Sequence, residues 1–129
     1  MEALESLKYL LLAVFGLTGI FARFGITSFA VKSLGFAAPA ATVVINIAGS
    51  FLIGLTYAIG IEKMPIGEDI QTALVSGLLG GFTTFSAFSF ETVSLLSSGR
   101  HIPALLYIAV SVVGGILAAL AGLYVGKLI

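Results

Sequence analysis

The most unusual stretch of the sequence covers residues 80–90 and reads Gly-Gly-Phe-Thr-Thr-Phe-Ser-Ala-Phe-Ser-Phe. Two adjacent glycines followed by two threonines make a poor helix centre, since each glycine costs about 1 kcal/mol relative to alanine. We therefore predict a break in a helix at this point. The carbonyl groups freed by a break favour a cation, and those of two crossing chains could enclose a small hard one. Alternatively, the glycines permit close helix packing and the threonines bond back to the preceding turn.

Aromatic and acidic side chains follow the predicted break at helical spacing. Phe85 and Phe88 are three residues apart and share a helix face, and Glu91 lies three residues further along. The positive edges of the two rings could contact a dehydrated anion, although an aromatic stripe usually serves packing. Glu91 lies inside an apolar segment, so it is protonated, paired or outside the narrowest part of an anion pathway. The sequence leaves these three alternatives open.

The single asparagine of the chain, Asn46, lies in the middle of another apolar segment. Its amide offers two donors, and Thr42, Ser50 and Gly54 continue the same helix face at intervals of four residues. A narrow face of small and polar residues suits the lining of a pore, and it equally suits close contact between helices.

Further hydroxyl groups and one arginine complete the candidate residues. Tyr107 and Ser111 are four residues apart and, with Ser86, offer a line of hydroxyl donors, although Tyr107 also suits an interfacial anchor. Arg23, near the end of the first apolar segment, either gives a vestibule its positive potential or extends its charge to the membrane surface. His101 is the single histidine, which excludes histidine-based triads and multi-histidine metal sites, and we expect no enzyme.

These residues lie in apolar stretches that we predict to be membrane-spanning helices, at residues 7–31, 37–61, 70–96 and 103–129. About 20 apolar residues cross the hydrocarbon core, so four spans leave only short loops. The continuous apolar runs do not have the alternating pattern of a β-barrel strand. We therefore predict an all-α membrane protein with a single domain over residues 1–129, whose third helix is broken in mid-membrane.

The composition points to the same surroundings. Of the 129 residues, 59% are hydrophobic and 9% are charged, whereas soluble domains carry about 25% charged residues. The formal net charge is zero, without the excess of basic residues that a nucleic-acid-binding protein shows. We expect the chain to contact a lipid bilayer and not nucleic acid. With no cysteine, the chain has no disulfide and no thiolate metal site.

Basic residues divide equally between the two predicted membrane faces. The face with both termini holds Lys8, Lys63 and Lys127, and the opposite face holds Arg23, Lys32 and Arg100. An excess of Lys and Arg on cytoplasmic loops normally sets the orientation of a membrane protein. An even count is typical of a chain that inserts in both orientations and forms an antiparallel homodimer, unless the predicted boundaries hide a weak bias.

Together these features resemble the Fluc (CrcB) fluoride channels, small four-span proteins that form dual-topology homodimers. Residues 80–88 are similar to the family signature GG-x-TTFSTF, and residues 46–50 (Asn-Ile-Ala-Gly-Ser) resemble its second-span asparagine motif. Ala87 stands where the signature commonly has threonine, and Gly115 offers no donor one turn after Ser111, so the roles of these positions stay open.

The resemblance implies passive, selective export of fluoride through two pores per dimer, in a multi-pass protein of the bacterial inner membrane that confers fluoride resistance. It implies that backbone carbonyl groups of Gly80 and Thr83 hold a structural Na⁺ shared by both subunits. It also implies that the fluoride pathway is lined or bordered by Thr42, Asn46, Phe85, Ser86, Phe88, Glu91, Tyr107 and Ser111, with Arg23 in the vestibule.

Two other classes of protein are alternatives. A small multidrug-resistance exporter exchanges protons for cationic compounds through a glutamate in its first span, and residues 7–31 contain no acidic residue. A non-transporting assembly subunit would use its glycine rows only for helix packing, and it would co-purify with a partner.

Overall fold

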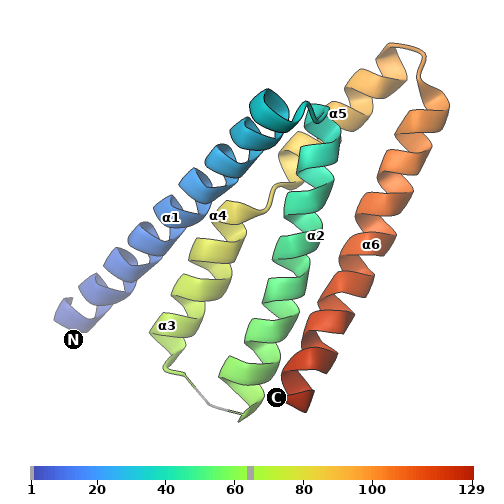
Figure 1. Ribbon diagram of the computed structural model, residues 1–129. Coiled ribbons are helices and arrows are strands. Elements are labelled where there is room, and N and C mark those ends of the chain that lie inside the picture. Colours follow the sequence, from blue (N-terminus) through green and yellow to red (C-terminus); the bar gives the residue numbers. More distant parts are fainter. Residues whose placement is uncertain (1, 64–65) are drawn as a thin grey trace.

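The computed structural model describes residues 2–63 and 66–129, and in these residues the chain is helical, with long antiparallel helices lying side by side (Figure 1). Within this part, the helical stretches long and apolar enough to cross a membrane are Ser6–Leu34, Ala38–Gly60, Glu68–Ser97 and His101–Leu128. Each corresponds to one predicted span. The chain is therefore a multi-pass membrane protein, with both termini at the same end of the bundle.

The first helix, α1 (Glu2–Leu34), continues beyond the predicted end at residue 31. Lys32, predicted to lie in a loop, is in its last turn, where the carbonyl end of the helix favours a positive charge. The chain turns at Gly35, whose φ of 72° strains any residue with a side chain. Helix α2 (Ala38–Tyr57) follows, with Pro39 in its first turn, where a missing N–H group costs little.

Two π-helical segments lie in the middle of the chain, and neither was predicted from the sequence. Helix α2 continues into η1 (Ala58–Lys63), and α3 (Glu68–Thr72) continues into η2 (Ala73–Leu79). The predicted loop at residues 62–69 is therefore shorter, and its residues 64–65 lie outside the described residues. π-Helical turns are rare in proteins, and those that occur are often found at functional sites. The position of η2 therefore points to the residues that follow it as candidates for a functional site.

The segment η2 leads into α4 (Gly80–Phe82), which is followed by Thr83, Thr84 and α5 (Phe85–Ser97). Thr83 has φ −84° and ψ 163°, and Thr84 has φ −152° and ψ 116°, so both are extended. In Figure 1 this segment is the short non-helical link between α4 and α5. Helical geometry thus stops at the two threonines and resumes at Phe85.

Helix α5 ends in a Schellman turn. The N–H of Gly99 donates to the carbonyl of Leu96 over 3.0 Å, and the N–H of Arg100 donates to that of Leu95 over 2.9 Å. Gly99 has φ 74°, the left-handed conformation that this turn requires. Helix α6 (His101–Leu128) begins directly afterwards, so the loop predicted at residues 97–102 is shorter than expected.

Glycines set the closest helix contacts. Helix α2 packs along α6, and α1 packs along η2 and α4 (Figure 1). Gly54 of α2 faces α6, and Gly122 of α6 faces α2. At each position, an added Cβ atom would overlap a backbone carbonyl oxygen of the other helix. At Gly19 of α1, an added Cβ atom would likewise overlap a backbone carbonyl oxygen of η2. Such small residues let backbones approach closely, which matters because lipid provides no hydrophobic driving force between helices.

Large aromatic side chains remain on the outside of this single chain. Phe21 and Phe24 of α1 are 69% and 70% exposed, and Phe85 and Phe90 of α5 are 79% and 73% exposed. Apolar surface on this scale requires lipid or another protein surface to cover it.

Candidate functional site

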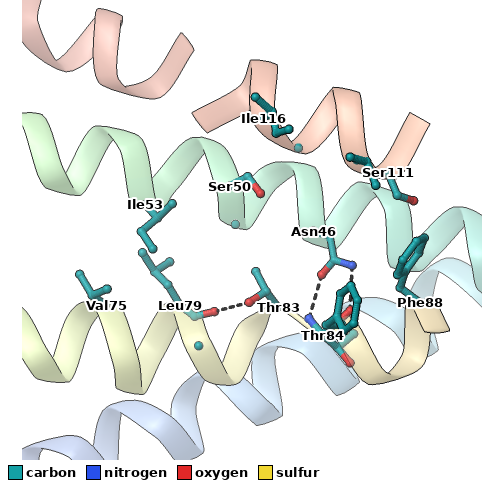
Figure 2. Close-up of a pocket in the computed structure, with 15 residues that line it drawn as sticks. Asn46, Ser50, Ile53, Val75, Leu79, Thr83, Thr84, Phe88, Ser111 and Ile116 are labelled. Atoms are coloured by element: carbon teal, nitrogen blue, oxygen red, sulfur yellow. Dashed lines mark hydrogen bonds between the residues drawn. The ribbon is translucent and has the colours of Figure 1, made fainter. Parts of the chain in front are cut away.

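A cavity of about 450 Å³ opens beside Thr83 and Thr84, between α2, η2, α5 and α6 (Figure 2). Its lining consists of Asn46, Gly49, Ser50, Ile53, Val75, Leu79, Gly80, Thr83, Thr84, Phe85, Phe88, Ser111, Val112, Gly115 and Ile116. Residues that the sequence analysis singled out on three separate spans therefore meet at one place.

Asn46 connects α2 to the extended residues that precede α5. Its Nδ2 donates to the carbonyl oxygen of Thr84 over 2.9 Å, and its Oδ1 accepts from the N–H of Thr84 over 2.8 Å (Figure 2). One side chain thus satisfies both main-chain polar groups of Thr84. Nearby, Gly49 lets α2 approach, since an added Cβ atom would overlap the methyl group of Thr83.

The two threonines also form hydrogen bonds through their own side chains. The Thr83 hydroxyl donates to the carbonyl of Leu79 over 2.9 Å, which is the back-bonding considered as an alternative in the sequence analysis. The Thr84 hydroxyl accepts from the N–H of Ala87 over 3.2 Å and caps α5. It also lies 3.3 Å from Oγ of Ser86. This cap was not predicted, although a threonine before a helix is a capping signal in the sequence.

These contacts leave two carbonyl groups without their usual helical donors. In a continuous helix, the carbonyl of Gly80 would accept from the N–H of Thr84, and that of Thr83 from the N–H of Ala87. Those N–H groups instead donate to Asn46 and to the Thr84 hydroxyl. Backbone oxygens are suitable ligands for a hard cation, so this pair fits Na⁺ chemically. In the described ranges, no cluster of three His, Cys, Asp or Glu side chains could hold a metal ion.

An aromatic row begins with Phe85 and Phe88, which line the cavity. The ring centroids of Phe85 and Phe88 are 5.5 Å apart, and that of Phe88 is 5.3 Å from the ring of Tyr107 on α6. The rings are tilted by 46° and 45°, so neither pair stacks face to face. Because Tyr107 is 7% exposed and Phe85 is 79% exposed, the row leads from the α5–α6 contact to the outer surface of the chain.

Glu91 accepts hydrogen bonds from two other helices. The Thr42 hydroxyl of α2 donates to its Oε1 over 3.0 Å, and the Tyr107 hydroxyl of α6 donates to its Oε2. Thr42 and Tyr107 are both buried, so the three polar groups satisfy one another between the helices. Glu91 therefore has two hydrogen-bond partners, and a paired glutamate was one of the three alternatives that the sequence left open. None of the three lines the cavity.

The remaining candidates, Arg23 and Ser111, lie in different surroundings. Nε of Arg23 donates to the carbonyl oxygen of Gly81 over 3.0 Å, so this part of its side chain lies at α4. No local signal could have shown this contact, because the two residues are 58 positions apart. Ser111 lines the cavity, and its Oγ is buried without a hydrogen-bond partner in the described part of the chain.

Comparison with known proteins identifies the family of the chain. Residues 10–123 match the family described as CrcB-like protein, Camphor Resistance (CrcB). The chain belongs to this family.

Several relatives of this CrcB chain are named fluoride-specific ion channel FluC. One from Chloroflexus aurantiacus is 44% identical over 105 residues, which cover 81% of this chain and 83% of the relative. One from Leptospira interrogans is 43% identical over 123 residues, covering 95% and 96%. One from Thermus thermophilus is 43% identical over 119 residues, covering 92% and 93%.

The CrcB family membership confirms the resemblance that residues 46–50 and 80–88 suggested. Because these relatives are named as ion channels, the comparisons agree with the expectation that the chain is not an enzyme. They do not favour the alternative of a small multidrug-resistance exporter.

Proposed function

We propose that this CrcB-family protein is a fluoride-selective channel that exports F⁻ passively and thereby confers resistance to fluoride. Membership of a family whose relatives are named fluoride-specific ion channels carries this proposal, at 43–44% identity over most of the chain. The membrane potential supplies the driving force, since it is worth about 2.3 kcal/mol per charge per 100 mV and a negative interior expels an anion.

The chemistry of the cavity supports the proposal. F⁻ is costly to dehydrate, so the protein must replace its water with donors that do not hold the ion too tightly. The Asn46 amide, the Ser111 hydroxyl and the ring edges of Phe85 and Phe88 are neutral groups of this kind. Ser111 is apt as a donor because its hydroxyl is buried and without a partner among the described residues.

The proposed pathway extends from the cavity along α5. Ser86 lies beside the Thr84 cap, and Tyr107 and Thr42 reach the carboxyl group of Glu91 further along the helix. Two hydroxyl donors to Glu91 spread its charge into hydrogen bonds and lessen its repulsion of an anion. Arg23, in this proposal, contributes positive potential to the vestibule.

We propose that the interruption at Thr83 and Thr84 lies within the membrane and that the carbonyl oxygens of Gly80 and Thr83, from two crossing chains, hold one Na⁺. Thr83 lies near the middle of the Glu68–Ser97 span, and both carbonyls lack their usual helical donors. Backbone at membrane depth must be covered by protein or line a cavity, and this segment lines one. A fixed cation there would raise the affinity for an anion without blocking its path.

We further propose that the functional unit is an antiparallel homodimer of dual topology with two pores. The equal division of basic residues between the predicted faces supports insertion in both orientations. Phe85 borders the cavity and yet is 79% exposed, so a second chain at this face would complete the wall of each pore.

Ion efflux from liposomes tests the channel. Purified protein is reconstituted into vesicles loaded with F⁻ or with Cl⁻, and the release of each ion is followed with ion-selective electrodes. We expect rapid loss of F⁻, little loss of Cl⁻, and loss of F⁻ transport in Phe85→Ile. If neither anion leaves vesicles that contain folded protein, the channel proposal fails.

A single introduced cysteine tests the topology, since the natural chain has none. Ser98→Cys lies in the exposed turn between α5 and α6. In intact cells, a membrane-impermeant maleimide should label roughly half of this cysteine if the chain inserts in both orientations. Complete labelling, or labelling only after the membrane is permeabilised, would exclude dual topology.

A further inference from the structure

Arg23 carries a charge on α1 and yet hydrogen-bonds to the glycine-rich α4. Its Nε donates to the carbonyl oxygen of Gly81 over 3.0 Å, and its side chain is partly buried. In a continuous helix, this oxygen would accept from the N–H of Phe85. Because α4 ends at Phe82 and Thr83 is extended, that helical bond is not available, and Arg23 takes the place of the missing donor.

The backbone that Arg23 contacts would otherwise be poorly restrained. Glycine populates a wide range of backbone angles, and the peptide unit between Gly80 and Gly81 carries the carbonyl oxygen proposed as a sodium ligand. Rotation about the bonds of Gly81 would turn that oxygen away. Asn46 restrains the other end of the interruption in the same manner, through both main-chain groups of Thr84.

The two glycines of α4 lie in different surroundings. Gly81 faces α1, where an added Cβ atom would lie 2.7 Å from the carbonyl oxygen of Gly16 and 3.3 Å from the nitrogen of Ile20. Gly80 instead lines the cavity and is exposed. Helix α1 therefore contacts the backbone of α4 at Gly81, both by close packing and by the Arg23 hydrogen bond. It does not cover Gly80, which remains open toward the cavity.

We propose that Arg23 is a positioning residue whose hydrogen bond to Gly81 holds the Gly80 carbonyl oxygen in the orientation that the sodium site requires. This inference rests on the sodium site proposed above. It differs from the vestibule role in its physical cause, because a donor at one defined position matters here and a positive charge does not.

Two substitutions separate the donor from the charge. Arg23→Gln places an amide N–H the same number of bonds from Cα as Nε of the arginine, and it carries no charge. Arg23→Met has a side chain of similar reach, and it offers neither a donor nor a charge. A role in positioning predicts that the Gln variant binds Na⁺ as the wild type does, whereas a role in electrostatics predicts that the Gln and Met variants bind Na⁺ equally weakly.

Binding of radiolabelled Na⁺ to purified protein, measured by equilibrium dialysis, distinguishes these roles without relying on fluoride flux. Gel filtration and circular dichroism first confirm that each variant is folded. In Arg23→Met we expect the Na⁺ concentration for half-saturation to rise roughly tenfold, the effect of losing one hydrogen bond. In Arg23→Gln we expect a change within about twofold, since a neutral donor keeps most of the restraint.

Each result has a defined meaning. Wild-type Na⁺ affinity in Arg23→Met, or equally weak affinity in Arg23→Met and Arg23→Gln, overturns the positioning role while the sodium site stands. Absence of Na⁺ binding in the wild type overturns the sodium site itself, and the inference falls with it. If Arg23→Met does not fold, Arg23→Gln decides alone, since a large loss of affinity in that variant contradicts the proposal.

Discussion

The side-chain amide of Asn46 hydrogen-bonds both main-chain polar groups of Thr84, over 2.9 Å and 2.8 Å. An amide can do this because it presents a donor and an acceptor side by side, as a peptide group does. Helix α2 thereby supplies the acceptor that the N–H of Thr84 loses where α4 gives way to α5, and it also holds the carbonyl group of the same residue. This relationship makes the geometry of the interruption depend on one side chain of a different span.

We expect Asn46→Asp to lower the stability of the protein by about 0.5–1.5 kcal/mol, the usual net contribution of one intramolecular hydrogen bond. Aspartate keeps an acceptor for the N–H of Thr84. Its second oxygen replaces the amide donor, so it repels the carbonyl oxygen of Thr84 where Asn46 donates a hydrogen bond. Thermal unfolding of the purified protein measures the effect. Val44→Ala, which changes a side chain that is 51% exposed on the same helix, is the control. Equal melting of the two variants would contradict the bridging role of Asn46.

The contact between α2 and α6 should not tolerate a methyl group at Gly122. An added Cβ atom there would overlap the carbonyl oxygen of Phe51, and a backbone atom cannot move aside as a flexible side chain can. We expect Gly122→Ala to destabilise the protein by about 1–3 kcal/mol or more in thermal unfolding.

Gly25→Ala is the matched control for that substitution, because no described atom beyond the backbone of its own helix lies within 4 Å of its added Cβ atom. At this exposed position in α1, alanine should be neutral or stabilising by up to about 1 kcal/mol, owing to its higher helix propensity. Similar losses in both variants would show that the close approach of α2 and α6 is not what limits stability.

We expect the effect of a phenylalanine substitution in α5 on fluoride transport to depend on whether that residue lines the cavity. Phe88 lines the cavity and contacts the rings of Phe85 and Tyr107, whereas Phe90 is 73% exposed and lines no part of it. In liposome efflux, Phe88→Ile should lower the initial rate of F⁻ release at least about tenfold, which corresponds to about 1.4 kcal/mol. Phe90→Ile should leave it nearly unchanged. Equal losses at both positions would point to a general loss of folding.

The two donors to Glu91 should act as a unit. Thr42→Val and Tyr107→Phe each remove one hydroxyl group and leave the shape of the side chain nearly intact. Because both hydroxyl groups bond to the same carboxyl group, their effects on the rate of F⁻ efflux should not add in a double-mutant cycle. We expect a coupling energy of at least about 0.5 kcal/mol. Strict additivity would mean that the two hydroxyl groups act independently of Glu91.

Much of the architecture could be predicted from residue types alone. Runs of apolar residues must cross a bilayer as helices because lipid offers no partner for backbone polar groups. Within residues 2–63 and 66–129, four such helices lie where they were predicted. The glycine and threonine residues at 80–84 indicated a weak point in a helix, and the motif at 46–50 indicated the family that the comparisons then confirmed.

The partners of the polar groups were decided only by the tertiary structure. Asn46 and Thr84 are 38 positions apart, and Arg23 and Gly81 are 58 positions apart, so helical periodicity cannot pair them. Their pairing depends on which faces of α1, α2 and α4 meet, and this in turn depends on glycines that allow backbones into contact. Periodicity within one helix determines which residues share a face, and only packing between helices determines what that face contacts.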